Sequence, residues 1–170
     1  GKEGLYGPIP NRLYPIFRDR DELAGAAQLG PLIEQALQDS SHLIVLCSPH
    51  AVRSRWVNEE IRLFKAMGKA DRVLCIVLDG EPMAEDTNGD PEDECLPLAA
   101  RRKVDDQGNI LHEIFEPGAA DLRSSGDGEK DAMLKIVAGL LGVGLDEIKQ
   151  RDILARQRRL VRITSTAVLL

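Results

Sequence analysis

The sequence has few aromatic residues and no excess of positive charge, and each shortage excludes a class of protein. Aromatic residues make up 4% of the 170 residues, too few to predict a platform on which nucleic-acid bases stack. The formal net charge of −6 argues against nucleic acid as the main partner. With 43% hydrophobic and 29% charged residues, the composition is that of a soluble globular protein, with room for one α/β domain and a short appendage.

Cysteine is also scarce, and its placement argues against a disulfide framework. Cys47 and Cys75 lie in apolar runs, and Cys95 lies in a polar stretch that we expect to be a loop. Three thiols so placed indicate reduced cysteines of a cytoplasmic protein, and no zinc site. No signal-peptide pattern opens the chain, which starts at Gly1 without an initiator methionine, so we expect a piece of a longer protein.

The remaining metal and nucleophile patterns are weak. Asp86, Asn88 and Asp90 have the spacing that opens an EF-hand loop, but Pro91 stands where glycine is required, so no calcium site is predicted. The histidines are isolated, and no serine or cysteine nucleophile can be combined with a histidine and an acid from their spacing. No resident metal or cofactor is therefore predicted.

Two continuous apolar runs set the predicted fold class. Residues 42–47 and 73–78 are typical of parallel strands that are buried on both faces. A helical pattern separates them, which predicts a right-handed βαβ unit. Upstream, residues 14–17 form a short candidate strand and residues from about 26 to 39 an amphipathic helix. The fold is predicted to be α/β, with a doubly wound parallel sheet of the flavodoxin-like kind.

The second half of the chain gives weaker signals. Residues 80–106 are acidic, contain proline and glycine, and lack periodicity, so we expect a loop outside the core. Residues 116–121 indicate another strand that leads into a loop. A helix is predicted over residues 130–141, followed by a stop at residues 142–144 and by a very polar helix that Asp146 begins. The helix over residues 130–141 is predicted to face the core with Met133, Ile136, Val137 and Leu140.

The segment after the first apolar run places an acid where an apolar residue is expected. Ser54 is a natural N-cap and Gly68 a natural stop, so a helix is predicted from about residue 55 to residue 67. At about 100° per residue, Glu60 falls inside a continuous apolar arc. The arc consists of Trp56, Val57, Ile61, Leu63, Phe64 and Met67, whereas Asn58, Glu59, Arg62 and Lys65 are predicted to face solvent.

Helix geometry leaves two interpretations of Glu60 open. An unpaired carboxylate against a core costs several kcal/mol, so it finds a partner, shifts its pKa or lines a cleft. In one interpretation Glu60 is a buried structural acid that an arginine or a helix N-terminus satisfies. In the other it is a functional carboxylate in a cleft.

Several motifs in the first half of the chain occur in the order found in one family. They are Phe-Arg-Asp-x-x-x-Leu from Phe17, Ala-Leu-x-x-Ser from residue 36, Ser-Pro at Ser48, and Ser-x-Trp-x-x-x-Glu from Ser54 to Glu60. Together they resemble a bacterial or plant-type Toll/interleukin-1 receptor (TIR) domain. The runs at residues 78–82 and 135–143 also resemble bacterial members. The likeness divides the chain into a TIR domain over residues 1–145 and a basic C-terminal helix over residues 146–170.

The resemblance implies a function and a set of site residues. Some TIR domains hydrolyse NAD+ at the nicotinamide–ribose bond, with a catalytic glutamate four residues after the tryptophan, which here is Glu60. The likeness implies that Trp56, Ser48, Phe17 and Arg18 contact substrate. It also implies that the loop with Asp19, Arg20 and Asp21 mediates assembly, although any one of these residues alone fits a solvated turn with ion pairs equally well.

The resemblance also indicates that the first strand and helix of a TIR domain are missing, and it leaves more than one function open. TIR domains begin with a strand and a helix that this sequence does not contain, so the sheet is expected to lack a strand between residues 14–17 and 43–47. One alternative is an NAD+-cleaving enzyme of stress or phage-defence signalling that self-association activates. The other is a non-catalytic adaptor that binds other TIR domains, with a receiver-like signalling domain as a distant third. The predicted partners are NAD+ and further TIR domains.

The C-terminal residues suggest two further interpretations. Five arginines precede an apolar rise at residues 163–170, a pattern that the positive-inside rule expects before a membrane helix. Eight residues are too few to span a bilayer, which needs about 20. The segment is therefore either the start of a membrane anchor or an amphipathic helix that packs on the domain or on a neighbouring subunit. The arginines are Arg151, Arg156, Arg158, Arg159 and Arg162.

Overall fold

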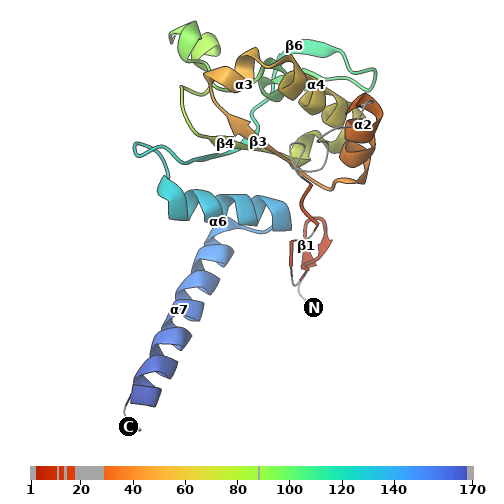
Figure 1. The fold of residues 1–170 in the computed structure, drawn as a ribbon. Helices are drawn as coiled ribbons and strands as arrows, with labels where there is room; N and C mark the ends of the chain where they lie inside the picture. Colours follow the sequence, from red (N-terminus) through yellow and green to blue (C-terminus); the bar gives the residue numbers. More distant parts are fainter. Residues whose placement is uncertain (1–2, 11, 14, 18–28, 88, 168–170) are drawn as a thin grey trace.

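The computed structural model describes residues 3–10, 12–13, 15–17, 29–87 and 89–167, and Figure 1 shows its architecture. The strands are β1 (Glu3–Gly4), β2 (Gly7–Pro8), β3 (Leu43–Cys47), β4 (Val73–Val77), β5 (Arg102–Val104), β6 (Ile110–Ile114) and β7 (Gly118–Asp121). The α-helices are α2 (Leu29–Asp39), α3 (Pro49–Arg53), α4 (Arg55–Phe64), α5 (Leu98–Arg101), α6 (Gly128–Leu141) and α7 (Leu145–Ala167).

A parallel sheet forms the centre of the domain, as the apolar runs predict. Its order is β3-β4-β7, with Leu43 opposite Val73 in one pair and Leu74 opposite Gly118 in the other. Helices α2 and α4 lie on one side of the sheet and α6 lies on the other (Figure 1). The α/β doubly wound class is therefore confirmed.

Apolar packing joins these layers, with one core on each side of the sheet. On the α4 side Ile61 and Phe64 are fully buried against Cys47, Cys75 and Val77. On the α6 side a smaller cluster contains Leu74, Ala120, Ala132 and Ile136. All three cysteines are buried free thiols. Cys95 lies outside the helices and strands, as predicted, but it is fully buried in the core.

The predicted ends of α4 agree with the structure. The Ser54 hydroxyl accepts a hydrogen bond from the N–H of Val57 at 3.3 Å, which is the expected N-cap. After Phe64 the chain makes one wider π-helical turn, residues 65–69, and Gly68 takes a φ of 74°. This left-handed conformation favours glycine, so the helical path ends there.

Residues 80–106 do not form a loop outside the core. They contain two short 3₁₀ turns (Ala84–Asp86 and Pro91–Asp93), helix α5 and strand β5. Leu96, Ala99 and Ala100 are buried in the main core. Charged groups hold this region in place, which explains why hydrophobic periodicity did not reveal it. The Glu94 carboxylate accepts hydrogen bonds from the N–H groups of Met83, Glu85 and Leu96, and Arg101 pairs with Glu85 and Asp86.

The strand predicted at residues 14–17 is not present in the part that the structure describes. Tyr14 lies outside the described residues, and residues 15–17 have no strand conformation. Ile16 and Phe17 are exposed. An extended segment becomes a strand only through hydrogen bonds to a neighbour. Among the described residues β3 is an edge strand that pairs with β4 alone, and the strand expected between it and residues 14–17 is absent, so residues 15–17 have no neighbouring strand to pair with.

Helix α6 agrees with the helix predicted over residues 130–141, whereas α7 extends to Ala167, beyond Leu160, where we expected it to end. Helix α6 ends at Gly142, whose φ is 59°, and the predicted core residue Met133 is exposed. Helix α7 starts at Leu145, so Asp146 lies in its first turn instead of capping it. Figure 1 shows α7 projecting away from the sheet, anchored to α6 at its first turns. There Ile148 is buried, and Lys149 pairs with Asp131 at 2.7 Å.

The described part of the chain, which stops at Ala167, contains no helix with both the length and the apolar character needed to cross a bilayer. The membrane interpretation of the C-terminal segment therefore stays a prediction.

Candidate active site

A cavity of about 380 Å³ opens between α2 and α4, and Glu60 and Trp56 both line it. Helix α4 contributes one side, and the first turns of α2 contribute the other. The described residues that line the cavity are Gly30, Pro31, Ile33, Glu34, Trp56, Glu59, Glu60 and Leu63.

The spacing of α4 explains why these residues share one side. Trp56, Glu59, Glu60 and Leu63 are three, four and seven positions apart, so they align along the helix surface that faces α2. Ile61 and Phe64 point into the core instead. Glu60 is half-buried at the edge between these two surfaces. Glu60 therefore lines a cleft together with Trp56, whereas Ser48, which was predicted to lie there too, is not among the described lining residues.

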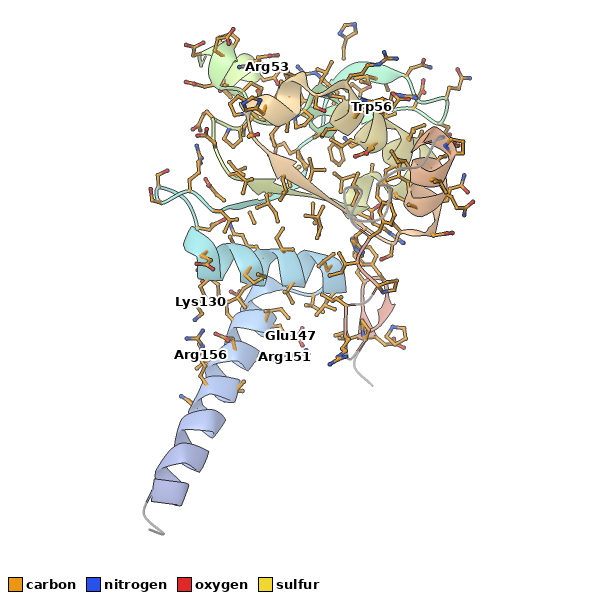
Figure 2. All side chains as sticks on the ribbon, viewed as in Figure 1. Arg53, Trp56, Lys130, Glu147, Arg151 and Arg156 are labelled. Atoms are coloured by element: carbon orange, nitrogen blue, oxygen red, sulfur yellow. The ribbon has the colours of Figure 1, made fainter. Side chains whose placement is uncertain are left out.

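Trp56 is not part of the hydrophobic core, although the apolar arc placed it there. Its side chain is 65% exposed, and Figure 2 shows it on α4, on the opposite side of the sheet from α6. A large aromatic ring left exposed beside a cavity has a flat apolar face that a ligand can cover.

Glu59 and Glu60 are neighbours in sequence but differ in their surroundings. Both oxygens of Glu59 accept hydrogen bonds from the Arg62 guanidinium, at 2.8 and 2.5 Å. This pairing holds the pKa of the Glu59 carboxyl below its usual value. Arg62 also donates to the carbonyl of Gly108 at 2.9 Å, which fixes the pair to the loop after β5. Glu59 is therefore a structural carboxylate.

The opposite surface of α4 corrects the expectation for Lys65. This side chain is only 3% exposed, and its ammonium donates to the carbonyls of Ala100 and Arg102 at 2.9 and 2.8 Å. It also lies 3.8 Å from the centre of the Phe115 ring. Burial lowers the pKa of Lys65 to about 8.

Asn58 also turns away from solvent, contrary to the prediction from the helical arc. Its amide donates to the carbonyls of Val52 and Ser54, both at 3.0 Å, and accepts the N–H of Ala99 at 3.2 Å. Asn58 and Lys65 together attach α4 to the segment around α5. They therefore position the helix that carries Glu60.

The other predicted site residues either do not line the cavity or lie outside the described residues. Ser48 is the N-cap of α3 and accepts the N–H of Ala51 at 3.3 Å, and it is not among the residues that line the cavity. Phe17 is 38% exposed and is also not part of the lining. Arg18 and the proposed assembly residues Asp19, Arg20 and Asp21 lie outside the described residues.

The structure adds Glu34, which sequence reasoning missed. It lies on α2 and lines the cavity together with Ile33. Ile33 and Leu37 pack into the core, so Glu34 borders the buried stripe of its helix just as Glu60 does on α4. That position next to the stripe is the signal that could have identified it.

The described lining contains three carboxylates, one exposed indole ring and no lysine or arginine. Such an arrangement suits a ligand that carries, or develops during reaction, a positive charge on a flat ring or on the atoms beside it.

Comparison with known proteins agrees with this geometry. Residues 11–82, which include α2, β3, α4 and β4, match the family described as Thoeris protein ThsB, TIR-like domain. Over these residues the chain is similar to a bacterial TIR-like domain. It is also 28% identical over 160 residues, 92% of its own length, to the NAD(+) hydrolase ApTIR of an Actinoplanes species. No solved structure gives a significant match.

The chain is similar to only part of that relative, since it spans 22% of the length of ApTIR. The matched family segment contains both helices that line the cavity. The likeness and the cavity therefore fall on the same part of the chain.

Proposed function

We propose that this TIR domain hydrolyses NAD+ at the nicotinamide–ribose bond and that Glu60 is its catalytic carboxylate. The observation that carries the proposal is the cavity between α2 and α4, which combines Glu60 with the exposed ring of Trp56. The similarity to a protein named as an NAD(+) hydrolase supports the same reaction.

The chemistry requires little acid catalysis. The bond between the ribose C1′ and the pyridinium nitrogen breaks, and its electron pair leaves with nicotinamide, which becomes neutral without accepting a proton. The ribose passes through an oxocarbenium-like state that water attacks at C1′, releasing one proton. A carboxylate beside the ribose stabilises this positive charge and accepts hydrogen bonds from the sugar hydroxyls. Glu60 supplies that carboxylate.

Trp56 provides the neighbouring apolar surface. It lies one helical turn before Glu60, so a ring stacked on the indole would lie next to the carboxylate. Ser48, Phe17 and Arg18 remain predicted substrate contacts. Replacing each by alanine and measuring KM for NAD+ tests them, and an unchanged KM removes that residue from the substrate site.

The direct test is to incubate the concentrated protein with NAD+ and to measure nicotinamide by chromatography. Release of nicotinamide that Glu60→Gln abolishes supports the enzyme. If a folded protein releases none at any concentration, the non-catalytic adaptor becomes the better interpretation.

We further infer that self-association controls this activity, with the loop of Asp19, Arg20 and Asp21 at the contact, and that the protein acts in stress or phage-defence signalling. Specific activity should then rise with protein concentration, and reversing the charge of Arg20 should prevent that rise. A specific activity that does not depend on concentration would contradict self-activation.

For the location we propose the cytoplasm, in keeping with the reduced thiols. Whether the protein is attached to a membrane depends on which interpretation of the C-terminal segment, membrane anchor or amphipathic helix, is correct. Fractionating cells that express the native gene tests this point, because a membrane anchor would bring the protein into the pellet even after a high-salt wash.

A further inference from the structure

Glu34 is a cavity carboxylate that the proposed reaction does not yet use. It comes from α2, on the other side of the cavity from Glu60. Glu59, the third carboxylate of the lining, is already bound through both oxygens by Arg62. Of the two glutamates on α4, one is therefore structural and the other is assigned to the reaction, whereas Glu34 has no assigned role.

The helix that carries Glu34 holds it in place. Ile33 and Leu37 of α2 pack against the main core, and Lys69 donates to the carbonyls of Leu37, Gln38 and Ser40 at the end of the same helix. A charged side chain on an anchored helix keeps its position at the cavity better than one on a loop does. Glu34 itself is exposed, so its carboxylate stays hydrated.

We propose that Glu34 is a positioning residue that attracts the positively charged nicotinamide ring of NAD+ while Trp56 covers the face of that ring. This inference rests on the proposed function, and it assigns the cavity to the oxidised, cationic form of the dinucleotide. A carboxylate on α2 favours the pyridinium cation electrostatically, and the indole adds a cation–π contact.

The attraction also helps to discriminate substrate from product. Nicotinamide is neutral once the bond has broken, so Glu34 no longer attracts it. Because the ring is charged in the ground state and the neighbouring ribose is charged in the transition state, Glu34 acts on both. Its removal should therefore raise KM more than it lowers kcat.

Trp56 makes the proposal directly measurable, since it is the single tryptophan of the chain. Its fluorescence is titrated with 1-methylnicotinamide, a stable pyridinium cation, and with neutral nicotinamide as the matched probe. Saturable quenching is expected with the cation, and weak or linear quenching with the neutral compound. Glu34→Gln should weaken binding of the cation about fivefold, which corresponds to about 1 kcal/mol. Glu34→Asp should restore part of the affinity.

The control variant is Glu113→Gln. Glu113 is an exposed carboxylate on β6 that pairs with Lys103 and does not line the cavity, so its loss should leave the titration unchanged. Raising the ionic strength should weaken binding of the cation to the wild-type protein and should matter less for Glu34→Gln.

The outcomes separate this inference from the proposed function. Quenching that is linear for both probes, or an equal affinity in Glu34→Gln and wild type, overturns the role of Glu34 even if NAD+ is cleaved. Saturable quenching that Glu34→Gln weakens supports the role even if no nicotinamide is released from NAD+. In that case the cation site stands and the hydrolase proposal fails.

Discussion

The two sides of α4 use their polar side chains in different ways. On the side facing α5, Asn58 and Lys65 are hydrogen-bonded to main-chain groups of the segments packed there. On the side facing α2, Glu60 and Trp56 border a cavity. Polar side chains on one side of α4 thus fix the position of the helix. On the other side, Glu60 lines a cavity that a ligand can enter. A polar residue next to an apolar stripe indicates a function only where the packing leaves a space beside it.

The largest expected effect is on the cavity side, from Glu60→Gln. The variant keeps the shape of the side chain and removes the charge that stabilises the oxocarbenium-like state. Nicotinamide release should fall a hundredfold or more, or about 3 kcal/mol in the barrier. The free energy of unfolding, measured with urea, should change little. A folded Glu60→Gln protein with wild-type activity would refute the catalytic role, and Glu113→Gln is the matched control.

Lys65→Met should produce the opposite pattern on the other side of α4. It removes the donor to the carbonyls of Ala100 and Arg102 and leaves these buried acceptors unsatisfied. We expect the free energy of unfolding to decrease by about 2 kcal/mol. The activity of the remaining folded protein should stay within a few-fold of wild type. An unchanged urea midpoint would mean that water replaces the ammonium there.

The same lysine predicts a dependence of stability on pH. Burial lowers the folded-state pKa of Lys65 to about 8, below its usual value, so the folded protein binds fewer protons than the unfolded chain above that pH. Stability contributed by Lys65 should therefore rise as the pH increases from about 8 toward 10.5, by at most about 1.4 kcal/mol per unit. The difference in unfolding free energy between wild type and Lys65→Met, measured across this range, should grow with pH. A constant difference would contradict the lowered pKa.

The smallest effect should come from Glu59→Gln, which sharpens the contrast with its neighbour Glu60. Losing the pair with Arg62 should cost at most about 1 kcal/mol, because both side chains are partly exposed. Since pairing lowers the pKa of Glu59, this contribution is present near neutral pH and is lost as the pH falls through the folded-state pKa. Nicotinamide release should change less than threefold by the same chromatographic assay. If Glu59→Gln reduced nicotinamide release as much as Glu60→Gln does, the catalytic role would have to be shared between Glu59 and Glu60.

Apolar runs and helix-capping residues predicted the central elements of the fold, although the apolar arc and spacing placed Trp56 and Met133 in the core and both are exposed. The strands β3 and β4, the capped start of α4 and the stop at Gly68 follow from short-range patterns, and all are present. The helical arc marked Glu60 as out of place but left open whether it was a buried structural acid or a cleft carboxylate, and the structure shows that it lines a cavity. The roles of Ser48, Phe17 and Arg18 came only from the resemblance to TIR domains and stay predictions.

The region from residue 80 to residue 106 shows where such reasoning fails. Glu94 and Arg101 are 1% and 2% exposed, although a sequence rich in acids predicts solvent exposure. Their charges are balanced by partners that the fold brings near: the Glu94 carboxylate accepts the N–H groups of Met83 and Leu96, and Arg101 pairs with Asp86. No local pattern contains that information. The same holds for Lys65, whose partners lie 35 and 37 residues away.

The sequence by itself predicted the βαβ unit and marked Glu60 as an acid within an apolar arc, because strand burial, helix capping and helical phase depend on residues close together in the chain. Only the tertiary structure decided which polar side chains form hydrogen bonds that hold elements together and which line a cavity. Lys65 and Asn58 became structural, Trp56 became exposed, and Glu34 joined Glu60 at one cavity because α2 packs against one side of α4 and the α5 segment against the other. The physical reason is that the interactions of a polar side chain depend on which element packs against it, and that element is distant in the sequence.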